Sequence, residues 1–266
     1  MNPNWKIDVF DPQAANFLGQ ASHMAYRSAG DVEKRLKSWK MELIHFFDVA
    51  DTQAFLARTP NPDGAMILTF RGTESLKDWM TDVDVNLVNG PGGKVHDGFL
   101  CALNTVWRRL LKLMDATREK RSLWITGHSL GGALATLAAA KIRLEKDQAV
   151  SGLYTFGSPR VGNEDFARNF DADFYYQNYR MVNNNDIVPR IPFRWLSYRH
   201  TGVFKYFDHT GRIKNKISWA ELTLDRLKGR IEDFLEPGTD GIKDHAMANY
   251  ATNLMKLLPR RKVRGR

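Results

Sequence analysis

The stretch that most constrains the fold is SLWITGHSLGGAL at residues 122–134. Its first part, LWIT, is short, apolar and partly β-branched, which is typical of a buried strand. Glycines follow, and then a run rich in alanine and leucine that favours a helix. The chain is therefore predicted to turn sharply from a strand into a helix, with Ser129 on the turn.

Gly127, Ser129 and Gly131 form the pattern GxSxG, and a strand-to-helix turn gives this spacing a mechanical cause. The central residue of such a turn is strained, and the residues two positions away must lack a Cβ for the turn to close. The turn also places the serine hydroxyl at a helix N-terminus, where free N–H groups stabilise an anion. A phosphate-binding loop is the alternative, but no lysine follows these glycines and they lack GxGxxG spacing. The pattern favours a serine that attacks a carbonyl.

Strands and helices alternate through the middle of the chain, which predicts an α/β fold with helices on both faces of a mostly parallel sheet. The N-terminal part of the sheet is expected to be antiparallel, because the turn sequence NPDG at 61–64 links two strand patterns. Expected strands are 41–47, 52–59, 65–70, 123–126, 152–156 and 174–182, with a hairpin across DHTG at 208–211. Expected helices are 14–28, 99–118, 130–146, 218–235 behind a capping box of Ser218 and Glu221, and about 245–258.

The net charge of +9 is concentrated at the C-terminus. Five of the positive charges follow Pro259, in a tail at 260–266 that is too polar to fold and is expected to be disordered. No aromatic platform accompanies these charges, so we expect no nucleic-acid partner. Peripheral contact with an anionic lipid surface stays open. The remaining residues, 1–259, are expected to form one domain, because no linker-like composition divides them.

The single cysteine, Cys101, excludes an intrachain disulfide. This favours a reducing compartment. No stretch approaches the ~18 apolar residues that a membrane span needs, and the first residues lack the layout of a secretory leader. We therefore expect a cytoplasmic location, or secretion if a leader precedes the residues given.

A serine hydroxyl needs a base that takes its proton and an acid that orients the base. On this type of turn the acid and then the histidine follow the serine in the chain. Asp186 is the candidate acid, because it comes directly after the expected strand at 174–182. Three histidines follow it: His200 in an expected strand, His209 at a hairpin tip and His245 at a loop-to-helix junction. Spacing alone favours His245 only weakly over the others.

A tetrahedral intermediate also needs hydrogen-bond donors that point at its oxyanion. The N–H of Leu130, directly after the serine, is one candidate donor. A second donor is expected from the loop after an earlier strand, and RGT follows the strand that ends at Phe70. Thr73 could offer both its N–H and its hydroxyl.

Six blocks of this sequence together resemble the class 3, fungal-type lipases of the α/β-hydrolase fold. They are ILTFRGT, VHDGF, ITGHSLGGALATLAA, TFGSPRVGN, VNNNDIVPRIP and DHAMANY, in the family's order between residues 65 and 250. The resemblance implies Ser129 as nucleophile, Asp186 as acid and His245 as base, with Thr73 and Leu130 in the oxyanion hole. Because one cysteine forbids the disulfides that secreted fungal members usually carry, the chain looks more like bacterial members.

Residues 74–85, ESLKDWMTDVDV, have an amphipathic pattern that fits the family's lid. The apolar positions follow helical spacing and are Leu76, Trp79, Met80 and Val83. Periodicity alone favours an ordinary surface helix. However, a helix that follows the oxyanion loop directly must cover the serine. The sequence GPGG at 90–93 looks like a hinge, so the lid is expected at about 74–90.

The expected activity is hydrolysis of carboxylic esters in acylglycerols through an acyl-enzyme, with the lid opening at an oil–water interface. No metal or organic cofactor is expected, because the sequence lacks clustered Cys/His ligand spacing. A phospholipase A1 and an aryl or feruloyl esterase are the alternatives within the hydrolases. A non-catalytic lipid-binding relative is the alternative from another class.

Overall fold

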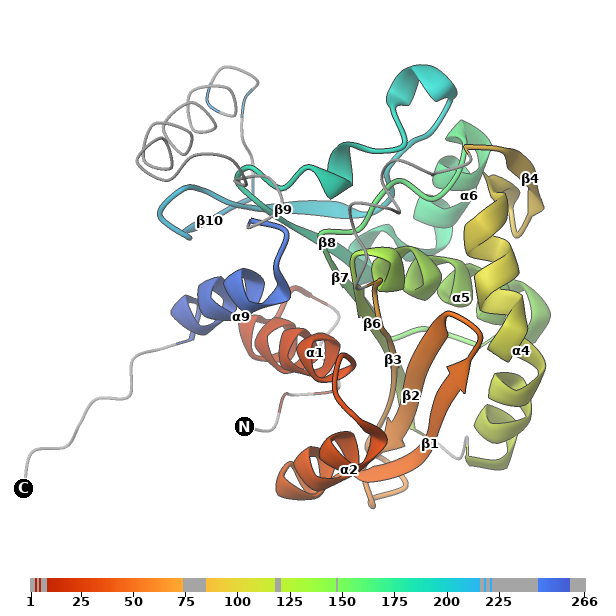
Figure 1. The fold of residues 1–266 in the computed structure, drawn as a ribbon, viewed down its shortest axis with the longest axis vertical. Helices are drawn as coiled ribbons and strands as arrows, with labels where there is room; N and C mark the ends of the chain where they lie inside the picture. Colours follow the sequence, from red (N-terminus) through yellow and green to blue (C-terminus); the bar gives the residue numbers. More distant parts are fainter. Residues whose placement is uncertain are drawn as a thin grey trace, which may run out of the picture.

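An eight-stranded sheet forms the centre of the computed structural model, which describes residues 3, 5, 9–73, 85–117, 121–146, 148–215, 218, 221 and 244–258 (Figure 1). The strands lie side by side in the order β1 (Glu42–Val49), β2 (Thr52–Arg58), β3 (Ala65–Phe70), β6 (Ser122–His128), β7 (Gly152–Phe156), β8 (Asn178–Asn183), β9 (Val203–Phe207) and β10 (Ile213–Lys214).

Strand directions confirm the predicted sheet. β1, β2 and β3 pair antiparallel, and β3, β6, β7, β8 and β9 then pair parallel in turn. β10 pairs antiparallel with β9, which is the predicted hairpin. The carboxyl ends of parallel strands meet at one edge, so the loops after β3, β6, β7 and β8 lie close together.

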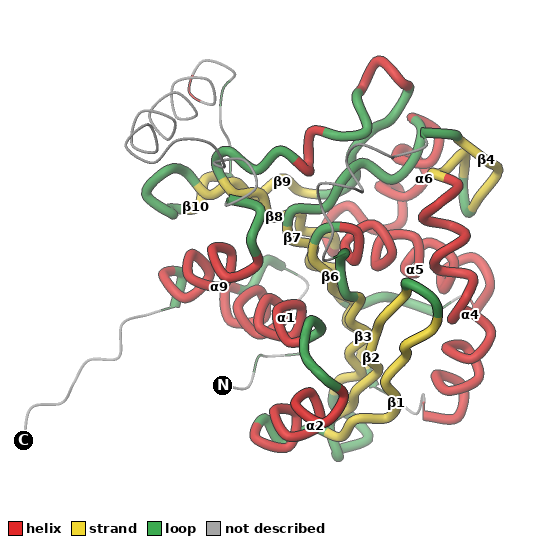
Figure 2. Tube along the Cα trace, viewed as in Figure 1, coloured by secondary structure: helices red, strands yellow, loops and turns green. Residues whose placement is uncertain are grey.

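Helices cover both faces of the sheet, as the alternation of strands and helices predicts (Figures 1 and 2). On one face lie α1 (Pro12–Met24), α2 (Ala29–Ser38) and α9 (Met247–Lys256). The other face packs against α4 (Asp97–Thr117), α5 (Leu130–Lys146) and α6 (Glu164–Phe174). Each face therefore has its own hydrophobic core.

The apolar run AMILTF of β3 is buried along its whole length. Successive side chains of a strand point to opposite faces. Accordingly, Ala65 and Ile67 belong to the core under α1, whereas Met66, Leu68 and Phe70 belong to the core under α5. A strand covered on both faces is therefore apolar at every position, without the polar alternation of a half-exposed strand.

The N-terminal helix is shorter than predicted, and a second helix follows it. Asp11 caps α1 by accepting from the N–H groups of Gln13 and Ala14, and the helix ends at Met24 rather than at residue 28. Ser28 then accepts from the N–H of Asp31 and begins α2, which the sequence analysis does not predict. A capping serine thus divides the segment into two helices.

The strand predicted at 174–182 is wrong over its first four residues. Phe174 ends α6 and Tyr175–Gln177 form the 3-10 helix η1, so β8 begins only at Asn178. Asn163 caps α6 by accepting from the N–H of Phe166. The apolar face of α6 packs into the core under α5, and this packing overrides the strand preference of the aromatic residues.

The segment GPGG is a hairpin turn and not a hinge. It connects β4 (Leu87–Gly90) to β5 (Gly93–His96), which pair antiparallel in a separate small sheet. Gly92 has a φ of 77°, a backbone conformation that residues with a side chain rarely adopt. Residues 87–90 of the range expected for the lid therefore form a strand.

Some predicted elements lie outside the described residues. These are most of the lid stretch, including Leu76, Trp79, Met80 and Val83, the helix expected beyond Glu221, and the basic tail at 260–266. The predicted capping box itself is present. The Ser218 hydroxyl accepts from the N–H of Glu221, and the Glu221 carboxylate accepts from the N–H of Ser218.

Within the described ranges, none of the helices combines the length and the apolar character that a membrane crossing requires.

The burial of α5 against the sheet predicts a large difference between two leucines of this helix. Leu137 is fully buried, whereas Leu144 is 62% exposed. Leu137→Ala should lower the free energy of unfolding by about 2–5 kcal/mol, because it leaves a cavity. Leu144→Ala should change it by less than about 0.5 kcal/mol. Urea unfolding followed by circular dichroism measures both, and equal effects would contradict the position of α5.

Candidate active site

Ser129 lies between β6 and α5, on the predicted sharp turn. Its φ of 58° is in the left-handed region, which costs a residue with a side chain on the order of 1–3 kcal/mol. A Cβ on Gly127 would lie 2.1 Å from the carbonyl oxygen of Gly131, and one on Gly131 would lie 2.4 Å from that of Phe70. At both positions a side chain would clash with the backbone, so glycine is required there, as expected from the GxSxG spacing.

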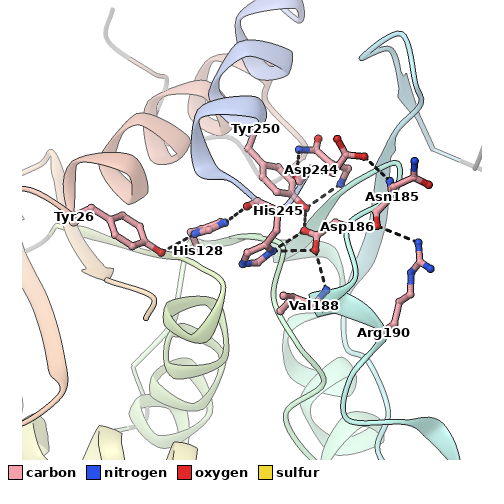
Figure 3. Close-up of polar contacts among 10 residues, drawn as sticks. Tyr26, His128, Asn185, Asp186, Val188, Arg190, Asp244, His245 and Tyr250 are labelled. Atoms are coloured by element: carbon pink, nitrogen blue, oxygen red, sulfur yellow. Dashed lines mark hydrogen bonds and ion pairs between the residues drawn. The ribbon is translucent and has the colours of Figure 1, made fainter. Parts of the chain in front are cut away.

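Asp186 and His245 are in direct contact (Figure 3). Asp186 lies in the loop after β8, and His245 lies just before α9. The Nδ1 atom of His245 is 2.9 Å from Oδ2 of Asp186 and 3.0 Å from Oδ1. Both residues are buried. Of the three histidines left open by spacing, His245 is therefore the one that contacts the candidate acid.

Two further donors hold the Asp186 carboxylate. The N–H of Val188 donates to Oδ1 at 2.9 Å, and the hydroxyl of Tyr250 donates to Oδ2 at 2.6 Å. Tyr250 in turn accepts from the N–H of Asn183 at 2.9 Å. Burial and the nearby Asp186 charge raise the pKa of Tyr250 well above its ordinary value, so the hydroxyl keeps its proton and remains a donor.

The turn after β7 joins the serine to the acid–histidine pair. The N–H of Ser129 donates to the carbonyl of Phe156 at 2.9 Å. A Cβ on the next residue, Gly157, would lie 2.7 Å from the Asp186 carboxylate and 2.9 Å from the His245 ring. The hydroxyl oxygen of Ser129 and Nε2 of His245 are buried, and neither has a hydrogen-bond partner among the described residues. The two atoms that would exchange a proton are therefore both uncommitted there.

The loop after β3 packs against the same turn. A Cβ on Gly72 would lie 2.9 Å from Cβ of Ser129 and 2.7 Å from the carbonyl oxygen of His128. Thr73 follows directly and is half-buried, and Leu130 is the first residue of α5. The two residues expected to supply oxyanion donors thus flank the serine from two segments.

His128 is a site residue that the sequence analysis does not assign. Its Nε2 lies 2.6 Å from the backbone carbonyl of His245, and its Nδ1 lies 2.7 Å from the hydroxyl of Tyr26 (Figure 3). A carbonyl can only accept, so Nε2 carries the proton and Nδ1 accepts from Tyr26. Burial and the neighbouring His245 hold the pKa of His128 well below its ordinary value, so the ring stays neutral.

Asp244 ties the histidine loop to the acid loop. Its carboxylate accepts from the N–H of Asn185 at 2.9 Å, and its carbonyl accepts from the Asn183 side chain at 2.9 Å. The sequence analysis does not predict this tie. Both asparagines belong to the run of three that precedes Asp186 in the sequence.

The other two candidate histidines lie in a loop and in a turn. His200 is not in a strand, contrary to the prediction, and its Nε2 lies 2.7 Å from the carbonyl of Pro189. His209 lies in the turn between β9 and β10, as predicted.

Comparison with known proteins places this geometry in a family. A family profile described as Lipase (class 3) matches residues 67–195. A secreted mono- and diacylglycerol lipase of Fusarium solani is 38% identical over 209 residues, which cover 76% of this chain and 60% of that protein. A solved lipase from Rhizopus microsporus var. chinensis is 30% identical with a TM-score of 0.62, covering 73% of this chain and 74% of that one. The chain belongs to the class 3 lipase family.

A second solved structure is described as a triacylglycerol lipase whose catalytic centre is formed by a serine protease triad. It is 26% identical with a TM-score of 0.67, and the match covers 81% of this chain and 92% of that one. The similar proteins reported with a source come from fungi and from plants such as Arabidopsis thaliana, so the expected likeness to bacterial class 3 lipases is not supported. The chain spans about half to three fifths of the length of the curated relatives it matches.

The buried histidines predict how stability depends on pH. Loss of solvation is the main cause that holds the pKa values of His128 and His200 well below 6.5, with neighbouring charges second. As the pH falls through about 6.5, each histidine gains a proton in the unfolded chain but not in the folded protein. The folded state should then lose about 1.4 kcal/mol per pH unit for each histidine.

Urea unfolding at several pH values between about 6.5 and 5 measures this slope. In His200→Gln, which keeps a donor for Pro189, the slope should fall by one proton, or about 1.4 kcal/mol per pH unit. A slope that stays the same in this variant would show that His200 is protonated in the folded protein.

Proposed function

We propose that this chain is a serine ester hydrolase that cleaves acylglycerols through an acyl-enzyme. The observation that carries the proposal is the contact between Asp186 and Nδ1 of His245, which leaves Nε2 of that imidazole without a partner among the described residues. Ser129 lies on a strained turn, and its N–H donates to Phe156, the neighbour of the Gly157 that packs against the same imidazole. Nucleophile, base and orienting acid are the three parts that acyl transfer by a serine requires.

In the proposed mechanism, Ser129 Oγ attacks the ester carbonyl carbon while Nε2 of His245 accepts the hydroxyl proton. Asp186 accepts from Nδ1–H and stabilises the imidazolium that forms. The tetrahedral intermediate collapses, and the imidazolium returns the proton to the departing alcohol. Water, activated by the same imidazole, then releases the fatty acid. This chemistry uses side chains and water alone, with no metal or organic cofactor.

We assign the oxyanion hole to the N–H of Leu130 and to the N–H and hydroxyl of Thr73. Leu130 begins α5, so its N–H is one of the donors that a helix leaves without an intrahelical acceptor. The packing of Gly72 against Ser129 supports Thr73 as the second contributor, because it brings the loop after β3 to the serine. Loss of one such donor typically costs on the order of 100- to 1000-fold in turnover.

Acylglycerols are the proposed substrates because similar proteins bear the names mono- and diacylglycerol lipase and triacylglycerol lipase. A phospholipase A1 and an aryl or feruloyl esterase use the same chemistry. A panel of soluble short-chain esters, emulsified acylglycerols and phospholipids distinguishes the three. A lipase would prefer the emulsified acylglycerols, whereas an esterase would be confined to short or aromatic soluble esters.

We further propose that the apolar stripe of Leu76, Trp79, Met80 and Val83 forms an interfacial lid. The proposal rests on the amphipathic sequence pattern and on its position directly after Thr73. Full burial of one side chain of this size is worth about 1.5–3 kcal/mol, so four of them can drive opening at a lipid surface. The excess of positive charge makes peripheral contact with anionic lipid part of the same proposal.

Replacement of the nucleophile tests the chemistry. Ser129→Ala should lower turnover of a soluble ester by several orders of magnitude, on the order of a million-fold if the three residues act as a unit. A fluorophosphonate probe, located by peptide mass, should label Ser129 in the unaltered protein and nothing in the variant. Ser38→Ala, at an exposed position on α2, is the matched control. Unchanged turnover in Ser129→Ala would end the hydrolase proposal, and absence of labelling would favour the non-catalytic lipid-binding alternative.

The lid proposal predicts different losses on two kinds of substrate. Trp79→Ser removes an apolar side chain that would enter lipid, so the rate on emulsified ester should fall much further than the rate on dissolved ester. Both rates are measured on one preparation at equal enzyme concentration. Equal losses on the two substrates would remove the lid proposal and leave the triad proposal unaffected.

A further inference from the structure

Two aromatic side chains project together from the loop between Asp186 and β9. Trp195 is 77% exposed, the most of any large apolar side chain that the structure describes, and Phe193 is 49% exposed. Their rings are stacked, with centroids 5.8 Å apart and an angle of 10° between the planes. They flank Arg194, which begins the 3-10 helix η3 (Arg194–Leu196), and this helix stands out from the body of the molecule (Figures 1 and 2). Apolar side chains scattered singly on a surface are normal, whereas contiguous ones can mark an interaction site.

The loop that carries the pair is fastened at its base. The Arg160 guanidinium donates to the carbonyl of Pro192 at 2.8 Å and also to that of Arg190, and the Arg160 N–H donates to Ile191 at 2.8 Å. On the other side, the buried Tyr198 donates its hydroxyl to the carbonyl of Val85 at 3.0 Å. These contacts hold the two rings outward.

Arginines lie next to the aromatic pair. Arg194 is exposed and stands between Phe193 and Trp195 in the chain, and the Arg199 guanidinium donates to the Arg194 carbonyl at 3.1 Å. Burial is the main cause that lowers the pKa of Arg160 to about 10, and the charges of Arg194 and Arg199 add to that effect, so each of these two arginines repels Arg160. Glu164 pairs with Arg199 at 3.2 Å and balances one of them. Anionic groups brought to this surface would relieve the remaining repulsion.

The loop that carries the pair has its base at the catalytic end of the sheet, where Arg160, shortly after β7, donates its N–H to the carbonyl of Ile191. Asp186 follows β8, and the N–H of Val188, the first residue of the 3-10 helix η2 (Val188–Arg190), donates to its carboxylate. A second exposed aromatic pair, Tyr175 and Tyr176, lies at the opposite end of the same strand, just before Asn178. Six residues at about 3.3 Å each separate the two ends by roughly 20 Å. The first pair is thus carried by a loop that begins at the active-site end of β8, whereas the second pair lies next to the other end of the strand.

Lipid fits this surface better than a protein partner. Two aromatic side chains bury at most about 150–250 Å² each, whereas a stable protein interface takes about 800 Å² from each partner. Tryptophan favours the boundary between water and hydrocarbon, and arginine binds phosphate through its planar fork. A stacked aromatic pair with arginines next to it therefore matches the headgroup layer of an anionic lipid surface.

We propose that Phe193, Arg194 and Trp195 form a fixed anchor that inserts into anionic lipid surfaces and turns the active site toward them. The anchor is a binding element outside the catalytic residues. Its use in lipolysis rests on the proposed function, but its binding to lipid does not.

The test measures binding to vesicles of phosphatidylcholine with and without phosphatidylglycerol, by co-sedimentation. All variants are made in the Ser129→Ala background, so that binding is read without hydrolysis. Trp195→Ala should weaken binding to both kinds of vesicle by about tenfold or more. Arg194→Gln should weaken binding to the anionic vesicles alone, by about fivefold. Tyr176→Ala, which removes an aromatic side chain of similar exposure at the opposite end of β8, is the matched control and should bind as its parent does.

Equal effects of Trp195→Ala and Tyr176→Ala would overturn the proposal, as would binding that does not depend on phosphatidylglycerol. Sedimentation velocity without lipid covers the remaining case. If Trp195→Ala abolishes self-association and leaves vesicle binding intact, the pair is a protein contact and the anchor is wrong. Failure of the anchor leaves the labelling and turnover results at Ser129 untouched, and failure of hydrolysis leaves the vesicle results untouched.

Discussion

A carboxylate removed from water has to be surrounded by hydrogen-bond donors, and the Asp186 side chain imposes this condition on the loops around it. Its donors come from three places: the N–H of Val188 in its own loop, the hydroxyl of Tyr250 on α9, and the imidazole of His245. A donor out of position would leave a buried charge partly unpartnered, at a cost of several kcal/mol. The packing of α9 on the sheet and the orientation of the imidazole therefore both serve to supply donors to the buried Asp186 carboxylate.

The serine side of the site depends on close backbone approach instead of charge. Gly127, Gly131 and Gly72 bring the ends of β6 and β3 within a distance that a Cβ would prevent, and Ser129 takes up the strain in its left-handed conformation. His128 links this turn to the histidine loop, because its neutral ring bridges Tyr26 and the backbone of His245. Close backbone contact thus positions Ser129, whereas hydrogen bonds to buried groups position His245.

What the sequence predicted well depends on local chemistry. The GxSxG turn and the buried strand 65–70 are defined by residue types a few positions apart, and both are present as predicted. The boundary errors arose where tertiary packing or a cap overrode local preference. The aromatic residues at 174–176 read as a strand but end α6 and begin η1, and Ser28 divides the predicted first helix.

The residues that support the site could not be predicted from local sequence patterns. Tyr26 and His128 are 102 positions apart, and Tyr250 and Asp186 are 64 apart. No periodicity marks such pairs, since each partner is ordinary in its own neighbourhood. For the same reason, spacing in the sequence did not decide among the three candidate histidines. The resemblance of whole blocks to a family favoured His245, and the contact with Asp186 agrees with that choice.

The contacts around Asp244 have an implication for how this chain can vary. Asn185 and Asn183 hold the carboxylate and the carbonyl of Asp244, and His128 holds the carbonyl of the next residue, so the imidazole is docked by its immediate neighbours. Substitution of Asn183, Asn185 or His128 can therefore displace the imidazole, although none of these residues belongs to the acid–histidine pair.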